Sequence, residues 1–291
     1  MGPERGRDLS GVRTLVLEIA WHGAAFHGWQ RQEGCPTVQG ELERAWTAVT
    51  GERVPIEGAS RTDRGVHALG QVAHLRTASP LPLERVRPAL NAHLPEAVVV
   101  RRAAEAAPGF HARFGARGKR YLYALWNAPV RPVILRGLVA WERRSLDPGR
   151  MREAAARLQG RHDFAAFQGA GSPREDTVRH LRAIRIRAHR GRILFLVEGD
   201  GFLYRMVRNL VGTLLEVGRG ARGPAWVESV LAGRDRRRAG PTAPAEGLYL
   251  YRVLYPQDPF RGLPKGYPEG PEPRLPDPLL PAPTPPPRNP G

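Results

Sequence analysis

The order of strand-like and helix-like segments most constrains what this chain can fold into. Some runs alternate apolar and polar residues, the period of a half-buried strand, and others repeat apolar residues at helical spacing. Strands are predicted at 15–20, 54–59, 71–76, 98–102, 121–126, 181–187, 192–197 and 248–255, and helices after Thr37, from Asp147-Pro148 and over 202–216. Neither half repeats a strand–helix–strand unit, so we predict an α+β fold with largely antiparallel sheets.

Length and proline content set the domain organisation. A chain of 291 residues suggests two domain-sized units, which we place at 1–107 and 108–256, with a linker at 103–109. Fourteen of the 29 prolines fall in the last 36 residues. That density excludes helix and central strand, so residues 257–291 are predicted to form an extended, disordered tail.

The charge balance points to a polyanionic partner. The chain has 45 lysines and arginines against 28 acidic residues, a formal net charge of +17, and 43 of the 45 are arginine. Genomic base composition accounts for part of this, but a strongly basic chain is typical of nucleic-acid binding. No apolar run reaches the roughly 18 residues of a membrane helix. The start lacks a signal-peptide core, and Cys35 alone cannot form an intrachain disulfide. We expect a cytoplasmic protein with no membrane partner.

Asp63 is the strongest candidate for a catalytic group. It lies between Arg61 and Arg64 in a polar loop that joins two predicted strands. An aspartate in such a loop commonly does no more than accept a hydrogen bond from its own turn. The flanking guanidinium groups favour the ionised carboxylate, however, and an ionised aspartate in a cleft can act as a base or a nucleophile.

Two further residues stand out by their surroundings. Tyr121 follows Lys119 and Arg120, so it can either pack in the core or stack on a nucleobase while the basic residues hold phosphate. Arg208 lies in an apolar helix, where it either extends to solvent at the rim or pairs with a buried aspartate. Gly212, one turn later, leaves room for another segment to approach the same helix face.

Other patterns carry less information. Aromatic and basic residues are interleaved in one stretch, Phe110, His111, Ala112, Arg113 and Phe114. This stretch, together with Arg174 in a polar loop, provides candidate RNA contacts. The histidines show no metal-ligand spacing in the sequence. The chain also lacks a phosphate-binding loop, a dinucleotide fingerprint and a nucleophile elbow. We therefore expect chemistry that needs neither a metal nor a nucleotide cofactor.

The loop around Asp63 reads Ser60-Arg61-Thr62-Asp63-Arg64-Gly65-Val66-His67-Ala68. Other stretches that stand in a fixed order along the chain are Gly28-Trp29-Gln30-Arg31-Gln32, Phe110-His111-Ala112-Arg113-Phe114, Lys119-Arg120-Tyr121-Leu122-Tyr123, Met206-Val207-Arg208-Asn209-Leu210-Val211-Gly212 and Ala245-Glu246-Gly247-Leu248-Tyr249-Leu250. Together they closely resemble the tRNA pseudouridine synthase A family. The resemblance spans about residues 13–256 and leaves out the proline-rich tail.

The chain departs from the family pattern at a few positions. Ser60 and Arg64 stand where the family usually has glycine and alanine, and Trp21-His22 stands where it usually has tyrosine and aspartate. None of these departures removes a group that the chemistry requires.

The resemblance implies isomerisation of uridine to pseudouridine at nucleotides 38, 39 and 40 of the tRNA anticodon stem-loop. By this similarity Asp63 is the nucleophile, Tyr121 stacks on the target base, Arg208 pairs with Asp63, and Arg61 helps to extrude the base. The resemblance also implies a homodimer and a pseudouridine synthase fold, in which two related halves have sheets that flank a basic cleft. The residues leave open whether Asp63 attacks the base, attacks the ribose or removes a sugar proton.

Two rival functions fit the same residues. One is a non-catalytic RNA-binding protein on the same scaffold, which the intact Asp63, Tyr121 and Arg208 disfavour. The other is a hydrolase that uses Asp63 to release the base. The sequence shows no second carboxylate near Asp63, which disfavours the paired-carboxylate route of most glycosidases.

Overall fold

The computed structural model describes residues 11–171 and 175–261, which form two compact units. Unit 1 comprises 11–120 and 249–261, and unit 2 comprises 121–171 and 175–248. These bounds differ from the halves expected from the sequence. The first boundary follows Arg120 instead of residue 107, and the closing strand belongs to unit 1 because it pairs there.

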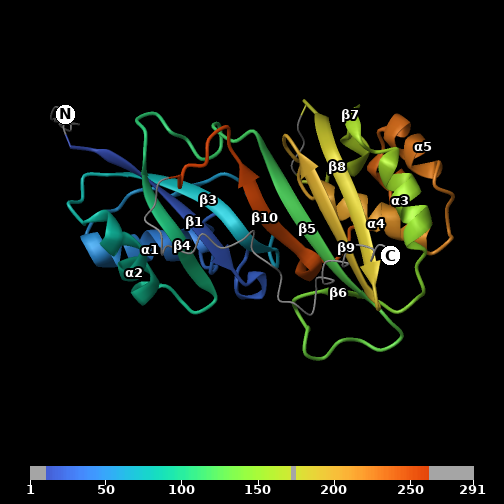
Figure 1. Ribbon diagram of the computed structural model, residues 1–291, viewed down its shortest axis with the longest axis horizontal. Coiled ribbons are helices and arrows are strands. Elements are labelled where there is room, and N and C mark those ends of the chain that lie inside the picture. Colours follow the sequence, from blue (N-terminus) through green and yellow to red (C-terminus); the bar gives the residue numbers. More distant parts are fainter. Residues whose placement is uncertain (1–10, 172–174, 262–291) are drawn as a thin grey trace, which may run out of the picture. The chain divides into compact units, whose positions relative to one another are not determined.

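Unit 1 is a sheet with two helices packed against each other (Figure 1). Its elements are β1 (Arg13–Trp21), the 3-10 turn η1 (Gly23–Ala25), α1 (Val38–Thr50), β2 (Glu57–Gly58), β3 (His67–Thr77), α2 (Leu83–His93), β4 (Val98–Ala106), the start of β5 (Gly118–Asn127) and most of β10 (Leu248–Leu254). The strand order is β4-β1-β3-β10, and β2 pairs with β3. β1 is antiparallel to both neighbours, whereas β10 runs parallel to β3.

The strand β1 lies in the middle of this sheet and is buried on both faces. Leu15 and Leu17 point to one face and Val16 to the other, and all three are fully buried. Opposite Leu17, β4 places Ala103, so the predicted linker at 103–109 is wrong for its first residues. Four residues of that stretch continue β4. Their mostly small side chains show no clear alternation of apolar and polar residues, so the sequence does not indicate a strand there.

The helix α1 shows how local sequence sets an element's ends. The helix begins after Thr37 as predicted, and the side chain of Thr37 caps it by accepting a hydrogen bond from the amide of Gly40 at 3.3 Å. Leu42 and Trp46 form the buried face. Gly51 ends the helix in the left-handed conformation, with φ 77°.

The predicted tail starts too early. Phe260 is only 4% exposed, and the guanidinium of Arg102 lies 4.3 Å from the centre of its ring. Asp258 also lies 3.7 Å from that guanidinium. Residues 258–260 therefore pack on unit 1, because an aromatic ring and an ion pair outweigh the prolines around them. Residues 262–291 lie outside the described part of the chain, as does Arg174.

Unit 2 combines hydrogen-bonded strands with three helices. Its elements are the rest of β5, β6 (Ala140–Glu142), α3 (Pro148–Ala156), β7 (Gly160–Asp163), the 3-10 turn η2 (Ala165–Phe167), β8 (Val178–His189), β9 (Arg192–Gly199), α4 (Met206–Gly218), α5 (Trp226–Gly233) and the turns η3 (Arg236–Arg238) and η4 (Ala245–Gly247). The strand order is β5-β9-β8-β7, with β6 parallel to β5. The α+β class with largely antiparallel sheets is thus confirmed. Figure 1 shows α3 beside α4, next to β8.

Turns and caps in unit 2 follow from the local sequence. Arg190 and Gly191 have φ of 45° and 74°, the positive values that a tight hairpin between β8 and β9 requires. Asp147 caps α3 by accepting hydrogen bonds from the two amides of Gly149 and Arg150. The helix α4 starts at Met206 instead of residue 202, because Arg205 adopts the left-handed conformation.

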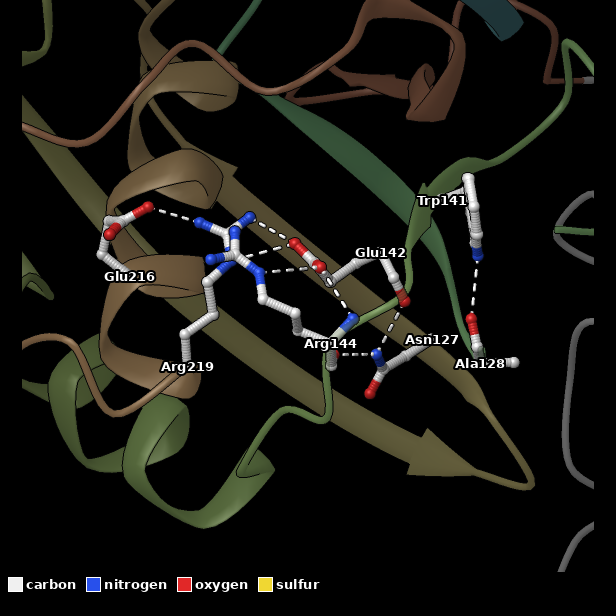
Figure 2. Close-up of polar contacts among 7 residues, drawn as sticks. All are labelled: Asn127, Ala128, Trp141, Glu142, Arg144, Glu216 and Arg219. Carbon is white, nitrogen blue, oxygen red and sulfur yellow. Dashed lines mark hydrogen bonds and ion pairs between the residues drawn. The ribbon is translucent and has the colours of Figure 1, made fainter. Parts of the chain in front are cut away.

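A polar network joins β6 to the end of α4 (Figure 2). The guanidinium of Arg219 donates to Glu142, with Nε 2.9 Å from Oε2, and to Glu216. The Glu142 carboxylate also accepts from the Arg144 amide at 2.9 Å. Asn127 donates to the carbonyl oxygens of Glu142 and Arg144. This network ties the end of β5, the strand β6 and the C-terminal end of α4 together.

No helix within 11–171 or 175–261 is long and apolar enough to cross a membrane.

Candidate active site

The loop that carries Asp63 connects β2 to β3, and β3 anchors its first residue. The buried side chain of Gln71 donates from Nε2 to the carbonyl of Ser60 at 2.6 Å and accepts from the Ser60 amide at 3.3 Å. Asp63 is half-buried, while Arg61 and Arg64 on either side are exposed. The loop therefore combines a fixed backbone with two accessible guanidinium groups.

The middle of the loop rests on the backbone of the Gly28-Trp29 motif. The Trp29 amide donates to the Thr62 carbonyl at 3.3 Å, and the Gly65 amide donates to Phe26 at 3.4 Å. A Cβ on Gly28 would lie 2.4 Å from the Thr62 oxygen, and its φ of 96° also favours glycine. This motif therefore serves as the support against which the Asp63 loop is shaped.

The end of the loop is held by aromatic and histidine side chains. His67 accepts a hydrogen bond at Nδ1 from the Gly23 amide, at 2.9 Å, and its ring stacks on Tyr249 with centroids 4.6 Å apart. Trp21 donates from Nε1 to the Val66 carbonyl at 3.0 Å. The departure from the family at Trp21 thus takes part in supporting the loop, and His67 acts as an anchor.

Tyr121 lies on β5 in unit 2. Its side chain is 6% exposed and meets the ring of Phe202 edge to face, with centroids 5.0 Å apart and planes at 83°. This T-shaped geometry is a favoured aromatic contact. The Phe202 contact fixes the direction of the Tyr121 ring, and stacking of this ring on a base stays a prediction.

Arg208 occupies the first turn of α4, also in unit 2, and is half-buried. Its Nε donates to the carbonyl of Ala243 at 2.7 Å, and its own carbonyl accepts from the Ala243 amide at 3.1 Å. A Cβ on Gly212 would lie 1.7 Å from the carbonyl oxygen of Pro241. The prediction that Gly212 admits another segment is confirmed, and that segment is residues 240–243.

The five-residue stretch predicted to contact RNA has an inner and an outer side. Ala112 is fully buried, and its carbonyl accepts from the Tyr255 hydroxyl at 2.5 Å, so its side chain lies on the inner side. Arg113 and Phe114 are exposed, Phe114 by 76%. His111 shapes the stretch, because its Nδ1 accepts from the amides of both Arg113 and Phe114.

One cluster in unit 1 has the residue types of a metal site. Glu57, His74 and His111 place possible ligand atoms within 4.8 Å of one another, although the sequence shows no such spacing. The bonds that His111 accepts at Nδ1 leave its ring proton on Nε2, which lies 3.5 Å from the Glu57 carboxylate. A cation at Nε2 would have to displace that proton. Burial and then the nearby His111 lower the pKa of His74. The contacts thus favour a hydrogen-bonded cluster over a metal centre.

The structure brings some of the predicted site residues together and leaves one pairing as a prediction. Arg61 and Asp63 share one loop of unit 1, while Tyr121 and Arg208 belong to unit 2. The pairing of Asp63 with Arg208 therefore stays a prediction. The supporting residues, such as Gln71, were not predicted from the sequence, because their partners lie outside their own strand or helix.

Comparison with known proteins shows which family the chain resembles. The profile of the family described as tRNA pseudouridine synthase matches residues 19–115 and 154–256. The chain is 47% identical over 245 residues to the tRNA pseudouridine synthase A of Geobacillus kaustophilus strain HTA426, which covers 84% of this chain and 95% of that protein. It is 44% identical over 244 residues to the protein of that name from Acetivibrio thermocellus, with 84% and 100% covered. For the Pseudomonas aeruginosa protein, the identity is 45% over 249 residues, with 85% and 87% covered.

The family profile spans the Asp63 loop, its Gly28-Trp29 support and the first turn of α4. The chain therefore belongs to the tRNA pseudouridine synthase A family, whose members are isomerases that convert uridine to pseudouridine in tRNA.

Proposed function

We propose that this enzyme isomerises uridines at nucleotides 38, 39 and 40 of the tRNA anticodon stem-loop, with Asp63 as the nucleophile. The observation that carries the proposal is the Asp63 loop itself. Its backbone is held at Ser60, at Thr62 and at Val66, while its carboxylate is half-buried between two exposed arginines. A fixed anionic group beside phosphate-binding groups suits attack on a nucleotide.

The reaction conserves atoms. The bond between the sugar C1′ and the base N1 breaks, a bond between C1′ and C5 forms, C5 loses its proton, and N1 gains one. Asp63 attacks either the base or the ribose, or removes a sugar proton, and in each route the detached uracil must be retained while it rotates. Before that, the base must leave its stack at a cost of about a few kcal/mol.

We assign the remaining roles to three residues. Arg61 occupies the space that the extruded base leaves and holds phosphate. Tyr121 stacks on the target base and excludes water from it. Arg208 pairs with the Asp63 carboxylate and sets its direction. Arg113 and Phe114 provide RNA contacts away from the reacting base. A homodimer in which the tRNA contacts both subunits is part of the proposal, and light scattering of the purified protein tests it.

Release of tritium from C5-labelled tRNA, without added cofactor, tests the activity. A synthase releases tritium and keeps the base in the RNA, a hydrolase frees uracil, and a binding protein does neither. Asp63→Asn should abolish tritium release while the tRNA dissociation constant stays within a few-fold, because phosphate contacts dominate affinity. Full activity of Asp63→Asn would exclude Asp63 as the nucleophile. To test the positions, transcripts should be labelled singly at nucleotides 38, 39 and 40.

A further inference from the structure

The segment 240–243 is the support of Arg208. It approaches α4 backbone to backbone, since a Cβ on Gly240 would lie 2.7 Å from the carbonyl oxygen of Gly212. From this segment, Ala243 accepts from Arg208 Nε at 2.7 Å and donates its amide to the Arg208 carbonyl. The direction of the Arg208 guanidinium therefore depends on where this segment lies.

Arg236 is the side chain that holds the segment in place. Its Nη1 donates to the Gly240 carbonyl at 2.9 Å, and its Nη2 donates to Thr242 Oγ1 and to Asn209 Oδ1, both at 3.0 Å. Arg236 thus connects the start and the middle of the segment to the residue that follows Arg208.

The acceptors around Arg236 are unusual for a guanidinium. Within the described part of the chain, it donates to two neutral carbonyl oxygens and one hydroxyl oxygen. Burial lowers the pKa of Arg236 from its ordinary value. Burying a cation costs desolvation free energy that neutral partners offset poorly, so this arrangement adds little stability. A guanidinium does, however, offer several donors in a fixed plane, which suits the precise placement of three acceptors.

Asn209 and Thr213 complete the arrangement from the side of α4. Asn209 donates from Nδ2 to the Phe167 carbonyl at 2.8 Å and accepts from Thr242 at Oδ1, at 2.6 Å. Thr213 accepts from the Gly240 amide at 3.0 Å and donates to the Asn209 carbonyl at 2.8 Å. Together these bonds tie the segment to the helix that carries Arg208 and fix that helix against η2.

We propose that Arg236 is a positioning residue for the isomerisation and acts through Ala243 on the direction of the Arg208 guanidinium. The inference rests on the proposed function, in which Arg208 orients the Asp63 carboxylate. Without Arg236, the position of the Ala243 carbonyl is no longer fixed. The Arg208 guanidinium, which donates to that carbonyl, then loses its fixed direction. A displacement of about 1 Å in a catalytic arrangement can cost about a hundredfold in rate.

The test compares two arginines that contact opposite ends of α4. Arg236→Ala and Arg219→Ala make the same chemical change, but Arg219 donates to Glu142 and Glu216 and to no residue of the segment 240–243 within the described chain. Single-turnover tritium release, the tRNA dissociation constant and urea unfolding are measured for both. We expect Arg236→Ala to slow the single-turnover rate by about 10- to 100-fold, with the dissociation constant within about twofold. Arg219→Ala should lower stability but leave the rate within about twofold of the parent.

A cycle with Arg208→Lys shows whether Arg236 acts through Arg208. The lysine keeps the charge but lacks Nε, so it should already be slow. Adding Arg236→Ala to it should then cost about threefold or less, because the two residues share one effect. Should Arg236→Ala fail to fold, Thr242→Val removes one acceptor from the same arrangement and should slow the rate by about 3- to 10-fold.

The outcomes separate this inference from the function on which it rests. If the parent enzyme releases no tritium, or if Arg208→Lys reacts at the parent rate, the proposed roles fail and the inference fails with them. A slow Arg208→Lys together with a parent rate in Arg236→Ala or Thr242→Val overturns the inference alone. The inference is also overturned if Arg236→Ala slows the Arg208→Lys enzyme by the same factor by which it slows the parent enzyme.

Discussion

The pair between Glu142 and Arg219 allows a stability prediction to be worked from contacts (Figure 2). Glu142 is 8% exposed, and its carboxylate accepts from Nε of Arg219 at 2.9 Å and also from Nη2. Arg219→Ala leaves this carboxylate with the Arg144 amide and a long contact to the Arg144 side chain. The variant therefore strands a largely buried charge.

Removing one partner of a buried ion pair typically costs about 3–5 kcal/mol. The Arg144 amide continues to solvate Glu142, so we take the lower end, about 3 kcal/mol, as the expected loss in the free energy of unfolding. Adding Glu142→Gln to Arg219→Ala should restore part of the loss, because the stranded charge is then gone. If the stability losses of Arg219→Ala and Glu142→Gln simply add in the double variant, the two residues are not energetically coupled.

The pH dependence of this loss has a definite sign. Burial alone would raise the pKa of Glu142, but the hydrogen bonds from Arg144 and Arg219 outweigh it and lower that pKa below its ordinary 4.5. The stabilisation is therefore complete above the unfolded pKa and is lost as the pH falls through the lower folded value. Urea unfolding of parent and Arg219→Ala at pH 7 and below pH 4 should show the difference between them shrinking in acid. A difference that stays constant would refute the reasoning.

Arg157 provides the matched control for this experiment. It also donates to two glutamates, Glu153 and Glu228, but these groups lie at the surface. Exposed ion pairs contribute little, so Arg157→Ala should leave the urea midpoint nearly unchanged.

Three other expectations concern helix packing, the anchoring of Phe260 and RNA binding. Gly212→Ala should destabilise the enzyme by about 3 kcal/mol, since its Cβ meets a backbone oxygen at 1.7 Å. Gly218→Ala should cost less, because its Cβ meets a flexible methionine side chain. Thermal unfolding of the two variants compares these losses. Phe260→Ala should lower the free energy of unfolding by about 3 kcal/mol, and an unchanged urea midpoint would show that this ring does not anchor unit 1. Binding of tRNA should weaken steeply with salt, and Arg113→Gln should reduce the slope of log K against log salt by about 0.7 to 0.9 if Arg113 contacts a phosphate.

The accuracy of sequence-based prediction followed the strength of local patterns. The strand β1, the cap of α1 and the hairpin of β8 and β9 were predictable because their signals lie within a few residues. The helix α2 was missed because Pro88 and several charges interrupt a short amphipathic pattern, in which Val86 and Leu90 are buried. The end of β4 was missed because alanines carry little periodic signal.

The candidate site likewise has residues that could be predicted from the sequence and supporting groups that could not. Asp63, Tyr121 and Arg208 could be singled out from residue type and neighbours alone. The groups that hold them could not, because each contact joins residues of different structural elements. Ser60 is held by Gln71 and Arg208 by Ala243, 35 residues away. Candidate site residues can thus be predicted from local motifs, while the contacts that hold them depend on the tertiary fold.

The split of unit 1 into two stretches has a consequence for how the chain is made. Tyr249 of β10 pairs with His67 of β3, roughly 180 residues earlier. On the ribosome, which releases the chain from its N-terminus, the strands β5 to β9 are available to unit 2 before unit 1 receives its last strand and Phe260. The Asp63 loop lies in the first quarter of the chain. Its contact with Tyr249 is nevertheless among the last contacts to form, because Tyr249 is synthesised late. Pairing across so long a separation is slow to form, so completion of the candidate site should lag behind the folding of unit 2 during synthesis.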